Sequence, residues 1–448
     1  MTNQFLNAQE YANVMLLLLK NQLVFGRLVD GQFKDQVTDE NGLTINVKRP
    51  PRFIDKKDGT ANLASQDIVT GTAPVSVDQY SKVHISVGDI EYVQSFNALM
   101  KNETMKSAAS TLANSVDSFI AGKTLLFNSW VAGGAAGTGG TNASDITKII
   151  ASNAQANGAH TRLMKQGVPN SDLSGAITFD DGEAIRGTLT GAFLPPDINR
   201  PALEDVRIPL LSTVKFYATQ QCPSLTTGTR TQGDGSTTGA QVKDANQNVN
   251  YRDVKGSAGT IGMQQTFTVT GGGAGGTIKA GEVFTIQNVY AWDWRANGGK
   301  GQKANYLQQF TVINDVTLDG SGIGTLTIQP AIIVQGTADA TGSTDTNTAF
   351  ATVDSVPVAN AYIKWAGAAS ATAQVRSAFH KRAISLVSAR LQMPFTGVAS
   401  YAVDPDTGIS IRYWRGSDIS TGAHIHRWDM IYGGQVMDCF LGTRICGS

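Results

Sequence analysis

The chain has 448 residues, and its 36 basic and 36 acidic side chains give a formal net charge of zero. This length exceeds what one compact core usually holds and predicts roughly two to four domains. Proteins that grip DNA usually carry a basic excess, because phosphate neutralisation supplies most of their non-specific affinity. The balanced charge therefore argues against a DNA-binding protein and favours an ordered protein assembly.

The N-terminal segment, residues 7–29, is apolar on nearly all sides and predicts a helix with Asn7 as its cap and Glu10 three residues later. Such a helix needs burial against its own core or against a neighbouring subunit. Without a basic leader or a small-residue cleavage site, we expect no signal peptide. No apolar run approaches the about 20 residues that span a bilayer, so we expect no membrane contact.

A basic, proline-containing segment follows at 46–59, "NVKRPPRFIDKKDG". Alternating apolar residues on both sides predict strands, and residues 44–57 and 74–87 would form the two arms of a hairpin. Each arm would span about 45 Å, whereas a typical domain has a radius of gyration of only about 15 Å. We therefore expect the hairpin to lie on another molecule. Its cations are Lys48, Arg49, Arg52, Lys56 and Lys57.

Three interpretations of these cations stay open: a solvated turn, a direct DNA contact and a subunit contact. Two prolines remove backbone donors and favour an extended segment, while the clustered cations repel one another unless anions meet them. Arginine pairs well with carboxylates in a forked geometry, so Arg49 and Arg52 suit a contact with acidic side chains of a neighbour. The subunit contact is the preferred hypothesis.

Residues 103–121 predict the clearest helix, ending near Gly122 and about 28 Å long. A shorter helix capped by Ser144 is expected next, carrying Ile146, Ile149 and Ile150. Residues 225–250 hold few apolar side chains and predict the entry to an inserted module. Short alternating segments at 260–270, 282–290, 308–318 and 323–334 predict an antiparallel β-barrel. A helix is expected near 357–369, and a hairpin turn at 403–410.

Chemical motifs are weak. The "AGKT" at 121–124 resembles part of a phosphate-binding loop, but the glycine it requires is replaced by Asp117. His424 and His426 share a strand face without an evident third metal ligand. Trp292 and Trp294 could form a sugar-stacking platform, although paired aromatic side chains more often cap a small barrel. We predict no catalytic residue, no metal and no cofactor. The three cysteines lack metal-binding spacing and predict reduced thiols: Cys222, Cys439 and Cys446.

Several stretches are similar to the tailed-phage major capsid proteins of the Hong Kong type, in the branch with an inserted telokin-like domain. They are "LLLLKNQLVFGRLV", "INVKRPPRF", "AFHKRAISLVSARLQMP", "ISIRYWRGSDIS" and "RWDMIYGGQVMDCFLGTRICG". The resemblance covers nearly the whole chain and implies an α+β fold with an inserted antiparallel β-barrel. It implies the following parts: an N-terminal arm at 1–40, an extended loop at 41–88, peripheral and axial domains at 89–225 and 353–448, and the barrel domain at 226–352.

The resemblance also implies a function. The chain would be a non-enzymatic major capsid (coat) protein that assembles, through a procapsid, into an icosahedral shell around phage double-stranded DNA. Its expected partners are copies of itself in hexamers and pentamers, scaffolding and portal proteins, and DNA held without sequence-specific contact. It would assemble in the host cytoplasm and reside in the virion. A loop at 242–253 would reach the neighbouring capsomer through Lys243, Asp244, Arg252 and Asp253. The alternative is a virion-borne or secreted carbohydrate-binding β-protein built on Trp292 and Trp294.

Overall fold

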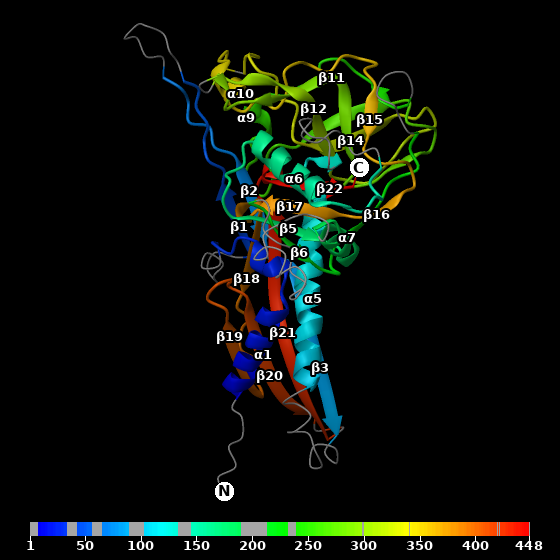
Figure 1. The fold of residues 1–448 in the computed structure, drawn as a ribbon. Helices are drawn as coiled ribbons and strands as arrows, with labels where there is room; N and C mark the ends of the chain where they lie inside the picture. Colours follow the sequence, from blue (N-terminus) through cyan, green and yellow to red (C-terminus); the bar gives the residue numbers. More distant parts are fainter. Residues whose placement is uncertain are drawn as a thin grey trace. The chain divides into compact units, whose positions relative to one another are not determined.

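The fold is that of a computed structural model (Figure 1). It describes residues 8–33, 43–55, 65–88, 103–132, 145–189, 213–231, 239–297, 300–339, 341–418, 420 and 422–447. The chain divides into two compact units, each assembled from segments that are distant in sequence. The first unit comprises Met1–Asn46, Pro74–Lys123 and Ile384–Gln435, and the second comprises Val47–Ala73, Thr124–Ala383 and Val436–Ser448.

The first unit is built on a long antiparallel sheet. Its central strand pairs with β20 on one edge and with β3 and β18 on the other, and β19 extends the sheet beyond β20. The strands are β3 (Gln79–Gly88), β18 (Ile384–Ala389), β19 (Val398–Val403), β20 (Ser410–Asp418) and the central β21 (Ala423–Val436). The predicted turn at 403–410 is confirmed, since it joins β19 to β20.

Helices α1 (Ala8–Gln22) and α5 (Met105–Lys123) pack against this sheet, and the short α2 (Phe25–Leu28) packs against α5. Helix α1 packs on α5, β19 and β20, with Met15 and Leu19 buried. Lys20 pairs with Asp404, at 3.0 Å, and with Asp406 in the β19–β20 turn. Much of α1 is therefore buried within its own unit, although Leu17 remains 60% exposed. The helix predicted at 103–121 is confirmed with a small shift at each end, past Gly122.

The helix predicted at 7–29 is interrupted between α1 and α2, and Asp117 of α5 binds the backbone at this interruption. Its two carboxylate oxygens accept hydrogen bonds from the backbone N–H groups of Val24, at 2.7 Å, and Gly26, at 2.9 Å. These donors lie at the start of α2, where a helix leaves N–H groups without internal partners. The aspartate that breaks the "AGKT" motif therefore serves as a distant cap. Burial raises the pKa of Asp117 to about 6, against the opposing effect of these hydrogen bonds.

The hairpin predicted from residues 44–57 and 74–87 is wrong in its partners. Strands β1 (Thr44–Lys48) and β2 (Thr72–Ser76) do form a two-stranded sheet. Residues 79–88, however, form β3 and pair along their whole length with β21. The alternation of apolar residues in 83–87 correctly predicts a strand, but alternation does not identify the neighbouring strand. The paired ribbon is accordingly only five residues long on each side.

The second unit contains a five-stranded mixed sheet with helices packed against it. The strand order is β4, β22, β17, β5 and β6, and the pairs β22–β4 and β5–β6 are parallel. The elements are β4 (Trp130–Ala132), α6 (Asn153–Lys165), β5 (Leu173–Ile177), α7 (Phe179–Leu189), β6 (Lys215–Ala218), β17 (Arg376–His380) and β22 (Gly442–Cys446).

The helix expected after Ser144 is wrong. Residues 145–150 form a turn and irregular chain, and α6 begins at Asn153. The cap is Ser152, whose hydroxyl accepts from the backbone N–H of Gln155 at 3.3 Å. Ile146 and Ile150 are buried although they are not in a helix. The backbone N–H of Ile150 finds its acceptor in the buried carboxylate of Asp181, at 2.8 Å.

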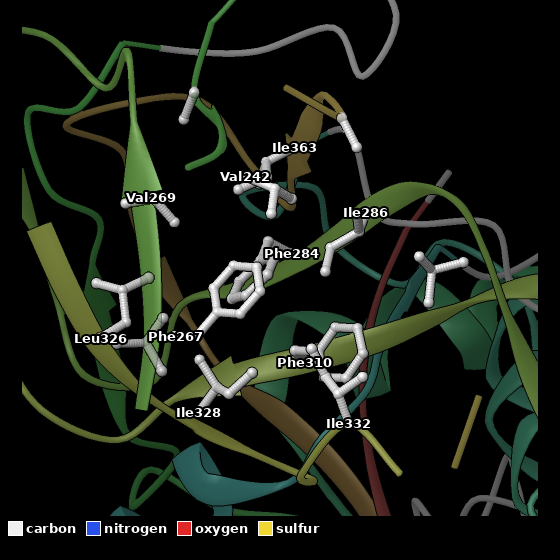
Figure 2. Close-up of a cluster of buried hydrophobic side chains, with 14 of the residues drawn as sticks. Val242, Phe267, Val269, Phe284, Ile286, Phe310, Leu326, Ile328, Ile332 and Ile363 are labelled. Atoms are coloured by element: carbon white, nitrogen blue, oxygen red, sulfur yellow. The ribbon is translucent and has the colours of Figure 1, made fainter. Parts of the chain in front are cut away.

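The predicted β-barrel is present as a six-stranded sheet, in the order β15, β11, β12, β14, β9 and β8. Val242 donates to the carbonyl of Ala361, and Ile363 donates to that of Ala240, both at 2.9 Å, so the two edge strands nearly close the sheet. Figure 2 shows apolar side chains from all sides meeting in its core. The strands are β8 (Gln241–Val242), β9 (Gln265–Thr270), β11 (Val283–Asp293), β12 (Gln302–Val312), β14 (Gly324–Gln329) and β15 (Ile363–Trp365).

The helix expected near 357–369 is also wrong, because this stretch supplies β15. Ile363 and Trp365 are fully buried while Lys364 between them is exposed, which is the two-residue period of a half-buried strand. The short elements that remain are η2 (Thr124–Leu126), β7 (Ser224–Thr226), α9 (Tyr251–Val254), β10 (Thr277–Ile278), β13 (Val316–Thr317), α10 (Asp345–Ala349), β16 (Thr372–Gln374), η4 (Lys381–Ala383) and η5 (Cys439–Leu441).

The three cysteines are free thiols, and all three are buried. Burial raises the pKa of the Cys222 and Cys446 thiols to about 12 each. In the described part of the chain, no helix has both the length and the apolar character needed to cross a membrane.

Candidate functional site

Arg52 is the best-defined member of the basic segment. Its guanidinium carbon lies 4.5 Å from the ring centroid of Trp294 and 5.3 Å from that of Phe350. Phe350 in turn stacks on Tyr251 of α9, with ring centroids 3.6 Å apart. Burial lowers the pKa of Arg52, and Asp438 opposes this effect. The cation is thus held by aromatic rings of its own second unit.

Arg49 lies beside this cluster. Its backbone N–H donates to the carbonyl of Gly71 at 2.8 Å, which pairs the two sides of the segment. Its Nε and Nη2 atoms are buried and have no hydrogen-bond partner among the residues that the structure describes. A Cβ at Gly71 would lie 2.4 Å from the carbonyl oxygen of Lys255, so this close approach requires glycine.

The segment is also anchored by apolar contacts. Ile54 packs against the buried cluster of the second unit to which Val69 belongs. Its other buried members are Tyr251, Met263, Ala331, Ile333, Ala349 and Phe350. The expectation that the arms find no cover in their own molecule is therefore wrong for Arg52 and Ile54 of the first arm. Val69 and Ala73, which precede the predicted second arm, are buried as well. The length of an arm says nothing about what packs against it. Here residues of the second unit, among them Tyr251 and Phe350, pack against the segment.

Arg252 of α9 has two carboxylate partners within the second unit. Its Nη2 lies 2.6 Å from Asp67 and its Nε lies 2.5 Å from Asp339. Hydrogen bonds from Thr341 and then from Arg252 hold the pKa of Asp339 well below its usual range. The same two carboxylates raise the pKa of Arg252. The charge of Arg252 is therefore already paired with two carboxylates of its own unit. Its role in a bridge to a neighbouring capsomer stays a prediction.

Four other predicted contact residues are exposed: Lys48, Lys243, Asp244 and Asp253. Lys48 ends β1. The backbone N–H of Lys243 donates to Thr268 at 3.1 Å, and the carbonyl of Asp244 accepts from Gln247 at 3.1 Å, which fixes their turn without using their charges. Lys56 and Lys57 lie outside the described residues. The structure thus gathers Arg49, Arg52 and Arg252 near α9, while Lys48, Lys243, Asp244 and Asp253 are exposed.

Sequence reasoning missed the partners of these cations, which are Asp67, Asp339, Trp294 and Phe350. For Asp339 a signal exists: its carboxylate accepts from the backbone N–H groups of Thr341 and Ser343, and "DATGS" is a typical composition for such a turn. For Asp67 no local pattern points to Arg252, because 185 positions separate them.

The two histidines on β21 do not form a metal site with a third ligand in the described part of the chain, where no suitable group of three side chains occurs. His426 is buried, and its Nδ1 lies 2.6 Å from the hydroxyl of Tyr413. Burial lowers the pKa of His426 to about 4, so the imidazole is neutral at physiological pH.

Trp292 and Trp294 flank a recess that is partly open to solvent. The Trp294 ring already stacks with Arg52, and the Arg295 guanidinium lies 5.0 Å from its centroid. Gly301 lies against Trp292 so closely that a Cβ there would be 2.2 Å from the indole nitrogen. These contacts from the same chain leave less ring surface for a sugar than the sequence suggests.

Comparison with known proteins gave one match over nearly the whole chain. The family described as P22 coat protein, gene protein 5, matches residues 8–447. A search of curated proteins found no match.

Solved structures gave matches of low sequence identity. A structure from Mycobacterium phage Che8 matches with 12% identity and a TM-score of 0.41, covering 100% of this chain and 96% of that chain. The capsid structure of the cyanophage P-SCSP1u matches with 9% identity and a TM-score of 0.41, covering 100% and 91%. The capsid of Ralstonia phage GP4 matches with 7% identity and a TM-score of 0.42, covering 100% and 93%.

Proposed function

Because this chain belongs to the P22 coat protein family, as the match over residues 8–447 shows, we propose how its copies meet and what they enclose. The chain is a phage major capsid protein, and it forms the icosahedral head shell. Its fold is the α+β capsid fold with an inserted antiparallel β-barrel. The family match is the single observation that carries this function.

The shell, in this proposal, confines double-stranded DNA and is built from hexamers and pentamers of the chain, with scaffolding and portal proteins as further partners. Assembly takes place in the host cytoplasm, and the protein performs no catalysis. The zero net charge supports confinement without tight gripping, since strong DNA binding needs many unbalanced cations. Kinship with the telokin-like branch, specifically, stays a prediction.

Contacts between copies should use the exposed charges of the second unit, Lys48, Lys243, Asp244 and Asp253. They should also use the loop at 393–398 of the first unit, where Phe395 is fully exposed and Met393 is 43% exposed. Exposed aromatic and apolar side chains on a described loop are typical of an interaction surface. Many modest contacts per copy favour an ordered shell, because a misplaced copy can still leave.

Charge reversal tests the contact surface. The double variant Lys48→Glu with Lys243→Glu should yield folded subunits that fail to form shells. Lys364→Glu, an exposed cation elsewhere in the second unit, is the matched control and should assemble normally. Circular dichroism reports folding, while sedimentation velocity and negative-stain electron microscopy report shells. Normal shells from the double variant would remove these residues from the contact.

Reversal of Arg49 together with Arg52 should also abolish shells. Both groups lie within the second unit's own packing, so circular dichroism of the unassembled variant must first show native structure. Unassembled wild-type subunits should elute from DNA–agarose near physiological salt, because the chain has no net positive charge. Steep, high-salt retention would instead support a DNA-gripping role.

A further inference from the structure

The recess beside Trp292 and Trp294 is lined by more positive than negative charge. Three cations face it: Arg52 of the basic segment, with Arg162 and Lys165 of α6. Aromatic rings supply much of its wall. Among the described residues that line it, Asp293 is the one carboxylate, and it also accepts the backbone N–H of Arg295 at 3.1 Å.

Arg162 shows the imbalance most clearly. Its side chain is buried, with the residue 1% exposed, and its guanidinium carbon lies 4.1 Å from the ring centroid of Tyr306. Its Nη2 donates to Gln309 at 3.2 Å, while its Nε has no hydrogen-bond partner among the described residues. A guanidinium held away from water without a carboxylate is unfavourable, and an incoming anion would offset that cost.

Burial also lowers the pKa of the other two cations of the recess. Burial lowers the pKa of Lys165, and repulsion from Arg162 lowers it further. Burial likewise lowers the pKa of Arg52. The indole nitrogen of Trp292 is a second buried donor without a hydrogen-bond partner in the described part of the chain. That nitrogen lies against Gly301. The recess therefore combines positive charge with one lining guanidinium, that of Arg162, whose Nε has no hydrogen-bond partner among the described residues.

We propose that this recess binds a carboxylate, and that in the shell the carboxylate belongs to an aspartate or glutamate side chain of a second copy of this chain. A carboxylate is planar, accepts two hydrogen bonds and carries a negative charge that offsets part of the positive excess of the lining. Lys165 and Arg52 are only partly buried, so the recess is open to an incoming side chain. A free small carboxylate shares this chemistry. The assignment of the carboxylate to a second copy of the chain rests on the proposed function. The proposal that the recess binds a carboxylate does not.

The first experiment uses unassembled subunits and two blocked tripeptides, acetyl-Gly-Glu-Gly-amide and acetyl-Gly-Gln-Gly-amide, at constant ionic strength. Tryptophan fluorescence should change saturably with the glutamate peptide alone, and Trp292→Phe should remove most of the change. Lys165→Gln should weaken binding by about fivefold or more, as expected for loss of one charge-assisted contact. Lys165→Arg should preserve binding. Lys279→Gln, whose lysine pairs with Asp315 elsewhere in the second unit, should bind as wild type.

Equal responses to the two peptides, or unchanged binding by Lys165→Gln, would overturn the site. The second experiment identifies the source of the carboxylate. In assembled shells the glutamate peptide should no longer change the fluorescence, and Lys165→Gln should lower the shell yield while Lys279→Gln does not. Shells that still bind the peptide as subunits do would overturn the second-copy source. Wild-type protein that forms no shell would contradict the proposed function, and the result with subunits would still stand.

Discussion

The guanidinium of Arg252 lies 2.6 Å from the carboxylate of Asp67, and this pair ties the returning side of the basic segment to helix α9 of the second unit. Arg252 also holds Asp339 at 2.5 Å. The pairs lie 185 and 87 positions apart in the chain, so they form only when the module has folded. A loop expected to rely on a neighbour is thereby partly ordered before any neighbour arrives.

Removal of the Arg252 charge should loosen this side of the segment. Arg252→Gln loses both ion pairs, so proteolytic cleavage within residues 65–73 should become several-fold faster, because cleavage follows the population of the opened segment. Asp253→Asn, at the exposed adjacent position, is the matched control and should be cleaved at the wild-type rate. Mass spectrometry of a limited digest identifies the sites. Equal rates in all three proteins would show that the pairs do not order the segment.

Gly433 should tolerate no side chain. A Cβ at Gly433 of β21 would lie 1.9 Å from the backbone oxygen of Ser76 in the first unit, a contact that only a backbone shift could relieve. Gly433→Ala should therefore lower the free energy of unfolding by about 1–3 kcal/mol or more. Gly416→Ala on neighbouring β20, where nothing lies within 4 Å of the new Cβ, should cost far less. Urea unfolding of both variants makes the comparison.

Arg444 should be essential to the second unit. Its fully buried guanidinium donates to the carbonyls of Gly281, at 2.5 Å, and Phe127, at 2.8 Å, and to the hydroxyl of Thr311. It thus ties β22 to the barrel strand β12. Arg444→Met would remove all three of these donated bonds, although the carbonyl of Phe127 would still accept from the Thr311 hydroxyl. We expect it to lower the free energy of unfolding by about 2–4 kcal/mol. The exposed Arg390→Met is the control, and similar denaturation midpoints for both variants would contradict this role.

Asp117 should make stability depend on pH. Burial raises its pKa from 3.8 to about 6, so folding favours the protonated carboxyl. The free energy of unfolding should therefore fall as pH rises through this window, by up to roughly 3 kcal/mol relative to Asp117→Asn, which stays neutral. Urea titrations of both proteins between pH 4 and 7 measure the difference. A constant difference across that range would show that Asp117 titrates at its ordinary value.

Local patterns in the sequence predicted several elements well. The apolar stripe of α5 and the alternating strands β9, β11, β12 and β14 depend on near neighbours in the chain, and the structure has all of them. Helix α5 and β11 lie close to the predicted bounds, whereas β9 and β14 are shorter than predicted and β12 lies earlier in the chain than the predicted 308–318. Errors arose where one local pattern fits two outcomes. The stretch at 357–369 has residues suited to a helix, but burial of Trp365 in the barrel core decided for a strand.

The candidate contact residues divide in the same way. The sequence by itself determined that five cations cluster around two prolines in a chain without net charge, and its family resemblance identified a capsid protein. Only the tertiary structure decided that Arg52 meets Trp294 and Phe350 and that Arg252 meets Asp67 and Asp339. The physical reason is distance along the chain: composition and periodicity record what each residue prefers, whereas the partner of a charge is set by the packing of remote segments.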